Sequence, residues 1–266
     1  MGNTVFSFIV LSFNSDKYIQ KCLFSINEAI EALNSVSEVF VIDNGSTDKS
    51  VEILSTFKFC KYITFKTIFF KVNTGTTFSR NTALKQAVGK YIVILDSDAY
   101  INSDVLINLK KYLEDNHDCG LAVPKLIYPD GRYQLSVDQF PTIIRKFSRY
   151  LFLKKTEGTN QINEKTDVDY AISAFWMLPF RMLKIIGYLD ERIFYSPEDV
   201  DYCIRIWKAG YKITYIPDEQ VVHDAQELSR VRSFRLVNYF FLSHLRGLFY
   251  LFKKHKYIFS AREFRK

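Results

Sequence analysis

The hydrophobic positions of the first hundred residues alternate between short continuous runs and runs with helical spacing. The continuous runs predict buried parallel strands at residues 5–11, 39–42, between 62 and 70, and 91–95. Helical spacing over 19–30 predicts a helix capped by Asn14 or Ser15, and a further helix is expected over 76–88. This alternation of strands and helices predicts a parallel sheet with right-handed crossovers.

The second half of the chain has a less regular pattern. Its expected elements are a helix over 103–115, a short strand at 120–123, a buried strand at 171–178, a short helix ending at Gly187, a helix beginning near Asp199, and a last strand at 212–216, shortly before His223. Residues 126–165 have no clear period and contain the turn signal Pro129–Asp130–Gly131. We expect a loop or flap in that region, near the molecule that the protein acts on.

Positive charge is concentrated near the end of the sequence. The 266 residues carry a net charge of +7, of which residues 228–266 contribute +9 and all others −2. A basic tail on a near-neutral body favours a local anionic surface, whereas a nucleic-acid-binding protein would need a basic binding face. Apolar residues from Phe234 to Phe252 recur three and four residues apart. This helical stripe either lies on the inner membrane face, or packs on the main domain or on a second subunit.

Cysteine usage and hydropathy bear on the cellular compartment. The four cysteines are scattered without metal-binding spacing, which indicates reduced thiols. No apolar run reaches the roughly 18 residues that a membrane-spanning helix needs. We therefore expect a cytoplasmic protein, whose tail is the candidate for a peripheral contact with the inner face of the cell membrane.

Polar segments follow the predicted strands, at the sheet edge where ligands bind in such folds. Asp96-Ser97-Asp98 offers two carboxylates that can reach one hard divalent cation and the diphosphate it bridges; the alternative is a solvated turn. The turn from Asp43 to Asp48 contains a Ser or Thr that caps the next helix, or it places Asp43 or Asn44 against a pyrimidine base. Both interpretations of this turn can hold together.

Three further segments carry candidate chemistry. Asn73 and Arg80 flank a predicted helix start and suit a diphosphate or a sugar, although a surface arginine is the alternative. Glu198 and Asp199 open a helix, where they either complement its dipole or supply a general base, and the dipole predicts that both are ionised near neutral pH. His223 is either an ordinary core or surface residue or a neutral imidazole beside a metal.

Taken in order, these segments resemble the family 2 glycosyltransferases, which have the nucleotide-sugar-binding GT-A fold. The resemblance covers nearly all of residues 4–225 and rests on the stretches SFIVLSFNS, VFVIDNGSTDKS, VNTGTTFSRNTALKQAVGKYIVILDSDAYI, PKLIYPDGRYQ and ISAFWMLPFRMLKIIGYLDERIFYSPEDVDYCIRIWKAGYKITYIPDEQVVHDA. The later stretches look most like the rhamnosyltransferase-like branch.

The resemblance implies an α/β fold with a Rossmann-like, mostly parallel sheet, flanking helices and a C-terminal helical extension. The implied organisation is a catalytic domain over 1–227, with a nucleotide-sugar-binding half at 1–100 and an acceptor-binding half at 101–227. A basic amphipathic helical tail over 228–266 follows it.

The resemblance also implies a role for each candidate residue. The nucleotide-sugar-binding residues are Leu11, Ser12 and Phe13 around the base, Asn44 at its edge, and Asp43, Asn73, Arg80, Asp96 and Ser97. The implied metal ligands are Asp98, as the direct ligand, Asp96 and His223, and the cofactor is Mn²⁺ or Mg²⁺. Asp199 is the implied catalytic base, with Glu198 beside it.

The implied reaction is an inverting transfer from a UDP- or dTDP-sugar to a saccharide or lipid-linked saccharide acceptor, in bacterial surface polysaccharide or glycoconjugate synthesis. The sequence lacks the Gln-x-x-Arg-Trp motif of processive relatives, so we expect a single addition. Ser173-Ala174-Phe175-Trp176 replaces smaller residues of many relatives, which alters the shape expected for the donor and acceptor sites. A non-catalytic nucleotide-sugar-binding or scaffold protein of the same fold is the alternative; the presence of all the acids and of His223 argues against it.

Overall fold

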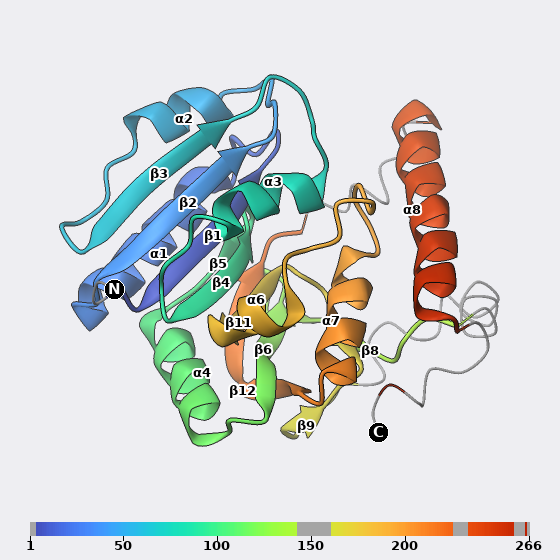
Figure 1. The fold of residues 1–266 in the computed structure, drawn as a ribbon. Helices are drawn as coiled ribbons and strands as arrows, with labels where there is room; N and C mark the ends of the chain where they lie inside the picture. Colours follow the sequence, from blue (N-terminus) through green and yellow to red (C-terminus); the bar gives the residue numbers. More distant parts are fainter. Residues whose placement is uncertain (1–3, 143–160, 226–233, 258–263, 265–266) are drawn as a thin grey trace.

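A central sheet with helices on both faces forms the body of the molecule in the computed structural model, which describes residues 4–142, 161–225, 234–257 and 264 (Figure 1). The helices are α1 (Ile19–Leu33), α2 (Ser50–Thr56), α3 (Thr76–Leu84), α4 (Ser103–Asp115), α6 (Arg181–Ile186), α7 (Glu198–Lys208) and α8 (Phe234–His255). The strands are β1 (Phe6–Ser12), β2 (Ser37–Asp43), β3 (Ile63–Phe69), β4 (Tyr91–Asp96), β5 (Ala99–Tyr100), β6 (Cys119–Ile127), β7 (Tyr133–Gln134), β8 (Val137–Asp138), β9 (Thr166–Asp167), β10 (Tyr170–Ala171), β11 (Phe175–Pro179) and β12 (Lys212–His223).

The strand order of the main sheet is β3-β2-β1-β4-β11-β6-β12-β5. The first four strands in this order are mutually parallel, and β11 is antiparallel to both of its neighbours. β12 returns parallel to β6, while the short β5 pairs with β12 in the antiparallel sense. The predicted α/β class with a mostly parallel sheet is therefore confirmed.

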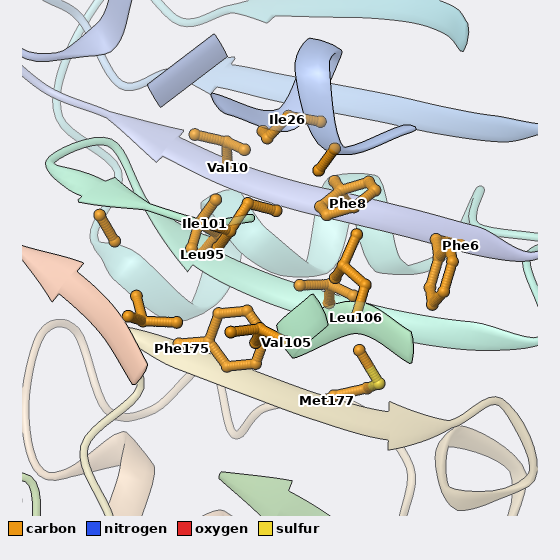
Figure 2. Packing of buried hydrophobic residues seen from close by; sticks show 14 of the residues in the cluster. Phe6, Phe8, Val10, Ile26, Leu95, Ile101, Val105, Leu106, Phe175 and Met177 are labelled. Carbon is orange, nitrogen blue, oxygen red and sulfur yellow. The ribbon is translucent and has the colours of Figure 1, made fainter. Parts of the chain in front are cut away.

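Alternate side chains of the central strands enter two separate cores. Phe6, Phe8 and Val10 of β1 pack with α1 and α4 on one face of the sheet, as Figure 2 shows. Ile9 of the same strand points to the opposite core, which includes Trp176 and residues of α3, α6 and α7. Each such side chain contributes roughly 1.5–3 kcal/mol when fully buried, so burial on both faces explains the continuous apolar runs of these strands.

Several predicted boundaries are wrong in the second half of the chain. β12 continues to His223, because a register shift between Ile216 and Gln220 carries the strand past its polar residues. His223 therefore lies within the strand. The strand expected at 171–178 is two strands, β10 and β11, separated by a turn at Ser173 and Ala174. The expected loop at 126–165 includes the end of β6 and strands β7 and β8, and its residues 143–160 lie outside the described part.

The predicted helix caps are also wrong. α1 begins after Tyr18 without a side-chain cap, and the Asn14 side chain instead accepts a hydrogen bond from the Thr47 amide at 2.8 Å. α2 begins after Lys49, and the carboxylate of Asp48 accepts from the Ser50 amide at 2.9 Å and, across the loops, from the Asp16 amide at 3.0 Å. These polar side chains tie two neighbouring loops together, so they are not free to cap the helices. α3 ends at Leu84, four residues before the predicted end.

The C-terminal part of α8 packs on the body of the protein. Leu248 and Leu251 are buried, and Leu251 belongs to the same core as α7. Figure 1 shows α8 alongside α7. For these residues the apolar stripe faces protein, as one of the two interpretations expected. Over the described ranges, no helix combines the length and hydropathy needed to cross a membrane.

Candidate functional site

The register of the parallel strands gathers polar side chains at one edge of the sheet. Ser12 pairs with Asp43, and Leu11 pairs with Asp96, so the carboxyl ends of β1, β2 and β4 coincide. β11 starts at the same edge, where the Asp96 amide donates a hydrogen bond to the Ala174 carbonyl at 3.0 Å. The sheet therefore places side chains from distant parts of the sequence in one site.

Asp96, Asp98 and His223 form a cluster at this edge. Each offers a ligand atom, and these atoms all lie within 4.8 Å of one another. Nε2 of His223 is 3.3 Å from Oδ1 of Asp98 and 4.0 Å from Oδ2 of Asp96. The pairing of β5 with β12 holds them together, because Ala99 pairs with His223 and the Asp224 amide donates to the Asp98 carbonyl at 2.8 Å. Two carboxylates and one imidazole can bind a divalent cation.

Gln134 orients the imidazole of His223. Nδ1 of His223 is 2.8 Å from Oε1 of Gln134, which accepts a hydrogen bond from it, and Nε2 faces the two acids. Burial lowers the pKa of His223, but the hydrogen bond to Asp98 and the charges of both acids outweigh it and raise the pKa above its usual value. Gln134 was not predicted from the sequence, in which its one signal is its place at the end of the family-like stretch PKLIYPDGRYQ.

Arg80 connects Asp96 of this cluster to the start of α7. It projects from α3 and is only 2% exposed. Its Nη2 lies 2.6 Å from Oδ1 of Asp96, and its Nη1 donates to Oγ of Ser173 at 2.7 Å and lies 3.5 Å from Oε1 of Glu198. The same Ser173 hydroxyl donates to Glu198 at 3.0 Å. Arg80 is therefore a buried positioning residue here, and the hydrogen-bonding role of Ser173 was not predicted.

The two acids at the start of α7 have different environments. Glu198 is buried, whereas Asp199 is partly exposed and accepts a hydrogen bond from the Val200 amide at 2.8 Å. Burial and the adjacent charge of Asp199 raise the pKa of Glu198 to about 8, against the opposing effect of Arg80. The expectation that the helix dipole keeps both carboxyls ionised near neutral pH is wrong for Glu198, because its burial outweighs the dipole.

Asp43, the last residue of β2, and Asn44, which follows it, have different hydrogen-bonding roles. Oδ1 of Asp43 accepts from the Ser46 amide, whereas its buried Oδ2 has no hydrogen-bond partner among the described residues. Asn44 uses its amide group within the protein: it accepts from the Thr74 amide at 2.8 Å and donates to Oδ1 of Asn73 at 2.9 Å. Asn44 thus holds the segment that leads into α3, whereas Oδ2 of Asp43 forms no hydrogen bond with the described residues.

The remaining predicted residues lie around the same edge. Ser12 is buried, and its hydroxyl is 2.7 Å from that of Ser15. Leu11 packs against the core and Phe13 is 40% exposed. Ser97, between the two acids, is buried. An exposed aromatic ring next to the carboxyl end of β1 can contact a planar ligand.

Residues 7–187 match the family described as Glycosyl transferase family 2. This match covers more than half of the chain, so the protein belongs to that family. The chain is also similar to the poly(ribitol-phosphate) beta-glucosyltransferase of Bacillus spizizenii, at 25% identity over 261 residues, which cover 90% of this chain and 40% of that protein. It is 34% identical over 119 residues to the poly(ribitol-phosphate) beta-N-acetylglucosaminyltransferase TarS of Staphylococcus aureus, covering 44% of this chain and 20% of TarS.

Solved structures share the GT-A fold of this chain. TarS 1-349 of S. aureus in complex with UDP-GlcNAc superimposes with a TM-score of 0.60 at 23% identity, over 86% of this chain and 61% of that one. GalNAc-T7 with UDP, GalNAc and Mn²⁺ gives a TM-score of 0.60 at 14% identity, over 83% of this chain and 44% of that one. The matches to TarS and to the Bacillus spizizenii enzyme cover 20% and 40% of those proteins, so this chain spans well under half of their length.

Proposed function

We propose that the protein is a glycosyltransferase that moves a sugar from a UDP- or dTDP-sugar to an acceptor hydroxyl, with Mn²⁺ or Mg²⁺ as cofactor. One observation carries the proposal: Arg80 links the Asp96–Asp98–His223 cluster directly to the Glu198–Asp199 pair. A site for the leaving diphosphate thus adjoins a site for a base. The UDP-GlcNAc of TarS and the UDP and Mn²⁺ of GalNAc-T7 support the donor class and the metal.

The donor atoms of the cluster suit a hard divalent cation. Two carboxylate oxygens and one nitrogen lie within 4.8 Å, and Gln134 leaves Nε2 of His223 facing the acids. Asp98, Asp96 and His223 would hold the ion, with Asp98 as the direct ligand. A bound cation would neutralise negative charge that develops on the departing nucleoside diphosphate.

The nucleotide base belongs at the ends of β1 and β2. Oδ2 of Asp43 is buried and unpaired among the described residues, so it can accept a hydrogen bond from the edge of a pyrimidine. Phe13 and Leu11 would flank the ring. The side chains of Asn44 and Asn73 are hydrogen-bonded to each other, so we propose that they shape the pocket. Asp43 is then the residue that binds the edge of the base.

Asp199 is the proposed general base. Its carboxylate is partly exposed, whereas Glu198 is buried against Arg80 and Ser173 and has a pKa of about 8. Two adjacent acids in such different environments have different roles: Glu198 orients its neighbour, and Asp199 accepts the proton. In the step itself the acceptor oxygen bonds to the anomeric carbon while the bond to the diphosphate breaks, and Asp199 takes the hydroxyl proton. A single displacement of this kind inverts the anomeric centre and adds one sugar.

The acceptor is proposed to be a saccharide or a lipid-linked saccharide in surface polysaccharide synthesis on the cytoplasmic side of the membrane. Arg246, Phe249 and Lys253 are exposed on the outward side of α8, Lys256 is exposed directly after it, and the Phe249 ring is 72% exposed. Interleaved basic and aromatic residues of this kind suit an anionic membrane surface. A second subunit on the same side is the alternative.

A donor and metal screen followed by turnover measurements tests the function. Binding of the right nucleotide sugar at a hundredfold excess over its Kd should stabilise the protein by about 2.7 kcal/mol in a thermal shift assay. Asp199→Asn should then lose about 10²- to 10⁴-fold in turnover while still binding donor and metal, and Glu198→Gln should lose less. Donor binding without hydrolysis or transfer would favour a scaffold protein, and full turnover in EDTA or in Asp98→Ala would refute the metal site.

A further inference from the structure

The segment 189–197, which leads directly into Glu198 and Asp199, is held from one side by α3. The Thr76 amide donates to the Phe194 carbonyl at 2.7 Å, and the Thr77 hydroxyl donates to the Ile193 carbonyl at 2.7 Å. Gly75 allows this approach, because a Cβ there would overlap the Phe194 carbonyl oxygen and lie 2.7 Å from its ring. The donor-binding half of the molecule thus fixes one side of this segment.

The opposite side of the segment is covered by α8. Gly247, inside this helix, packs directly on the peptide before α7: a Cβ there would overlap the carbonyl oxygen of Ser196 and lie 2.8 Å from Cδ of Pro197. One turn earlier, Nδ1 of His244 lies 3.1 Å from the Ser196 hydroxyl. Glycine within a helix costs about 1 kcal/mol relative to alanine, so its presence here has a packing reason.

Ion pairs and hydrogen bonds join the end of α8 to residues at the start of segment 189–197 and just after it. Lys254 Nζ lies 2.7 Å from Oδ2 of Asp190 and 2.6 Å from Oδ1 of Asp201. The Tyr250 hydroxyl donates to Asp190 at 2.7 Å, and Nε2 of His255 lies 2.8 Å from Asp201. Asp190 precedes the two acids at the start of α7 and Asp201 follows them. The helix is therefore anchored on each side of the proposed base.

We propose that α8 is a positioning element of the catalytic centre and that Gly247 is the positioning residue that sets the location of Asp199. This proposal rests on the function proposed above. Segment 189–197 lies between α3 and α8, so any displacement of α8 at Gly247 is passed to the peptide one residue before Glu198. The basic tail is thereby part of the active-site scaffold, in addition to any role of its outward side.

Gly247→Ala tests the proposal in the full chain. The added methyl meets backbone atoms that cannot rotate away, so helix and segment must separate by about 1 Å. A misplacement of that size can reduce turnover about 100-fold. We expect a 10- to 100-fold lower kcat with the Kd of donor and metal changed less than twofold, and a larger loss in Gly247→Val. Alanine favours the helix itself, so a weaker helix cannot produce this loss.

A second arm uses the ionic anchors. Lys254→Met should lower kcat in the same direction as Gly247→Ala, and its matched control is Lys111→Met, an exposed lysine of α4 on the other face of the sheet. Hydrogen exchange gives a readout independent of turnover: amides of 189–199 should exchange faster in Gly247→Ala, while those of β1 and β2 should not.

The outcomes separate this proposal from the proposed function. Normal kcat and normal exchange in Gly247→Ala would overturn the positioning role, as would a loss of donor affinity in proportion to kcat. If the wild-type protein transfers no sugar from any donor, the proposed function fails, and the exchange experiment still decides whether α8 fixes segment 189–197.

Discussion

Replacing Glu198 with glutamine should make the protein more stable, and increasingly so as the pH rises. The carboxyl has an ordinary pKa of 4.5 and a pKa of about 8 in the folded protein. Between these values the folded state binds more protons than the unfolded chain, so the stability contributed by Glu198 falls with rising pH. Glutamine has the shape of the protonated side chain and does not titrate, so Glu198→Gln removes this decline.

The size of the effect follows from the same values. A difference of one pH unit within this window corresponds to about 1.4 kcal/mol, so the variant should gain about 3 kcal/mol over the wild type at pH 7. For a chain of this size that is a rise in Tm of roughly 5–10 °C. Near pH 4.5 the two proteins should be almost equally stable, because Glu198 is then protonated in the folded state.

Urea unfolding of both proteins at pH 5, 6, 7 and 8 in EDTA measures the difference directly, since other titrating groups cancel. Glu114→Gln is the control of opposite sign: its hydrogen bond with Lys90 lowers the pKa of Glu114, so this variant should be less stable than the wild type by an amount constant over this range. A difference between Glu198→Gln and wild type that does not change with pH would refute a raised pKa for Glu198.

Three further predictions concern the metal site, the buried arginine and the tail. Arg80→Ala removes the cation beside Asp96 and the donor to the buried Ser173 hydroxyl, and should destabilise the fold by about 1–3 kcal/mol in urea unfolding; an unchanged midpoint would contradict the bridging role. Gln134→Ala should weaken Mn²⁺ binding about 10- to 100-fold by calorimetry, and normal affinity would show that His223 needs no orienting partner. Lys253→Ala should weaken sedimentation with anionic liposomes about fivefold while Lys111→Ala does not, and the membrane proposal fails if wild-type protein does not bind at low salt.

The fold could be predicted because its strands are buried on both faces and its helices are amphipathic. Those two patterns locate most elements of the first hundred residues and the helix that begins at Glu198. The predicted boundaries are wrong where a strand continues through polar residues. β12 passes through Asp218 and Glu219 without ending, and a register shift of this kind has no signature in hydrophobic spacing.

The candidate site was predictable as a set of segments and not as an arrangement. Asp96, Asp98 and His223 follow from the motif and from family resemblance, and the strand pairing brings them together. The pKa of Glu198 could not be predicted, because local sequence gives the helix dipole and not the burial against Arg80 that outweighs it. Gln134 acts through a hydrogen bond to a residue 89 positions away, and Ser173 through hydrogen bonds to residues 93 and 25 positions away, which no local pattern encodes.

The pairing of β5 with β12 has a consequence for the protein during its synthesis. Asp98 and His223 are joined only when a strand from near the end of the catalytic region closes against one made much earlier. A nascent chain that has emerged as far as β11 contains β1, β2 and β4, yet it lacks the imidazole and the outer strand that complete the cluster. If the cluster binds a divalent ion as proposed, ribosome-bound intermediates should bind that ion weakly until β12 has been added.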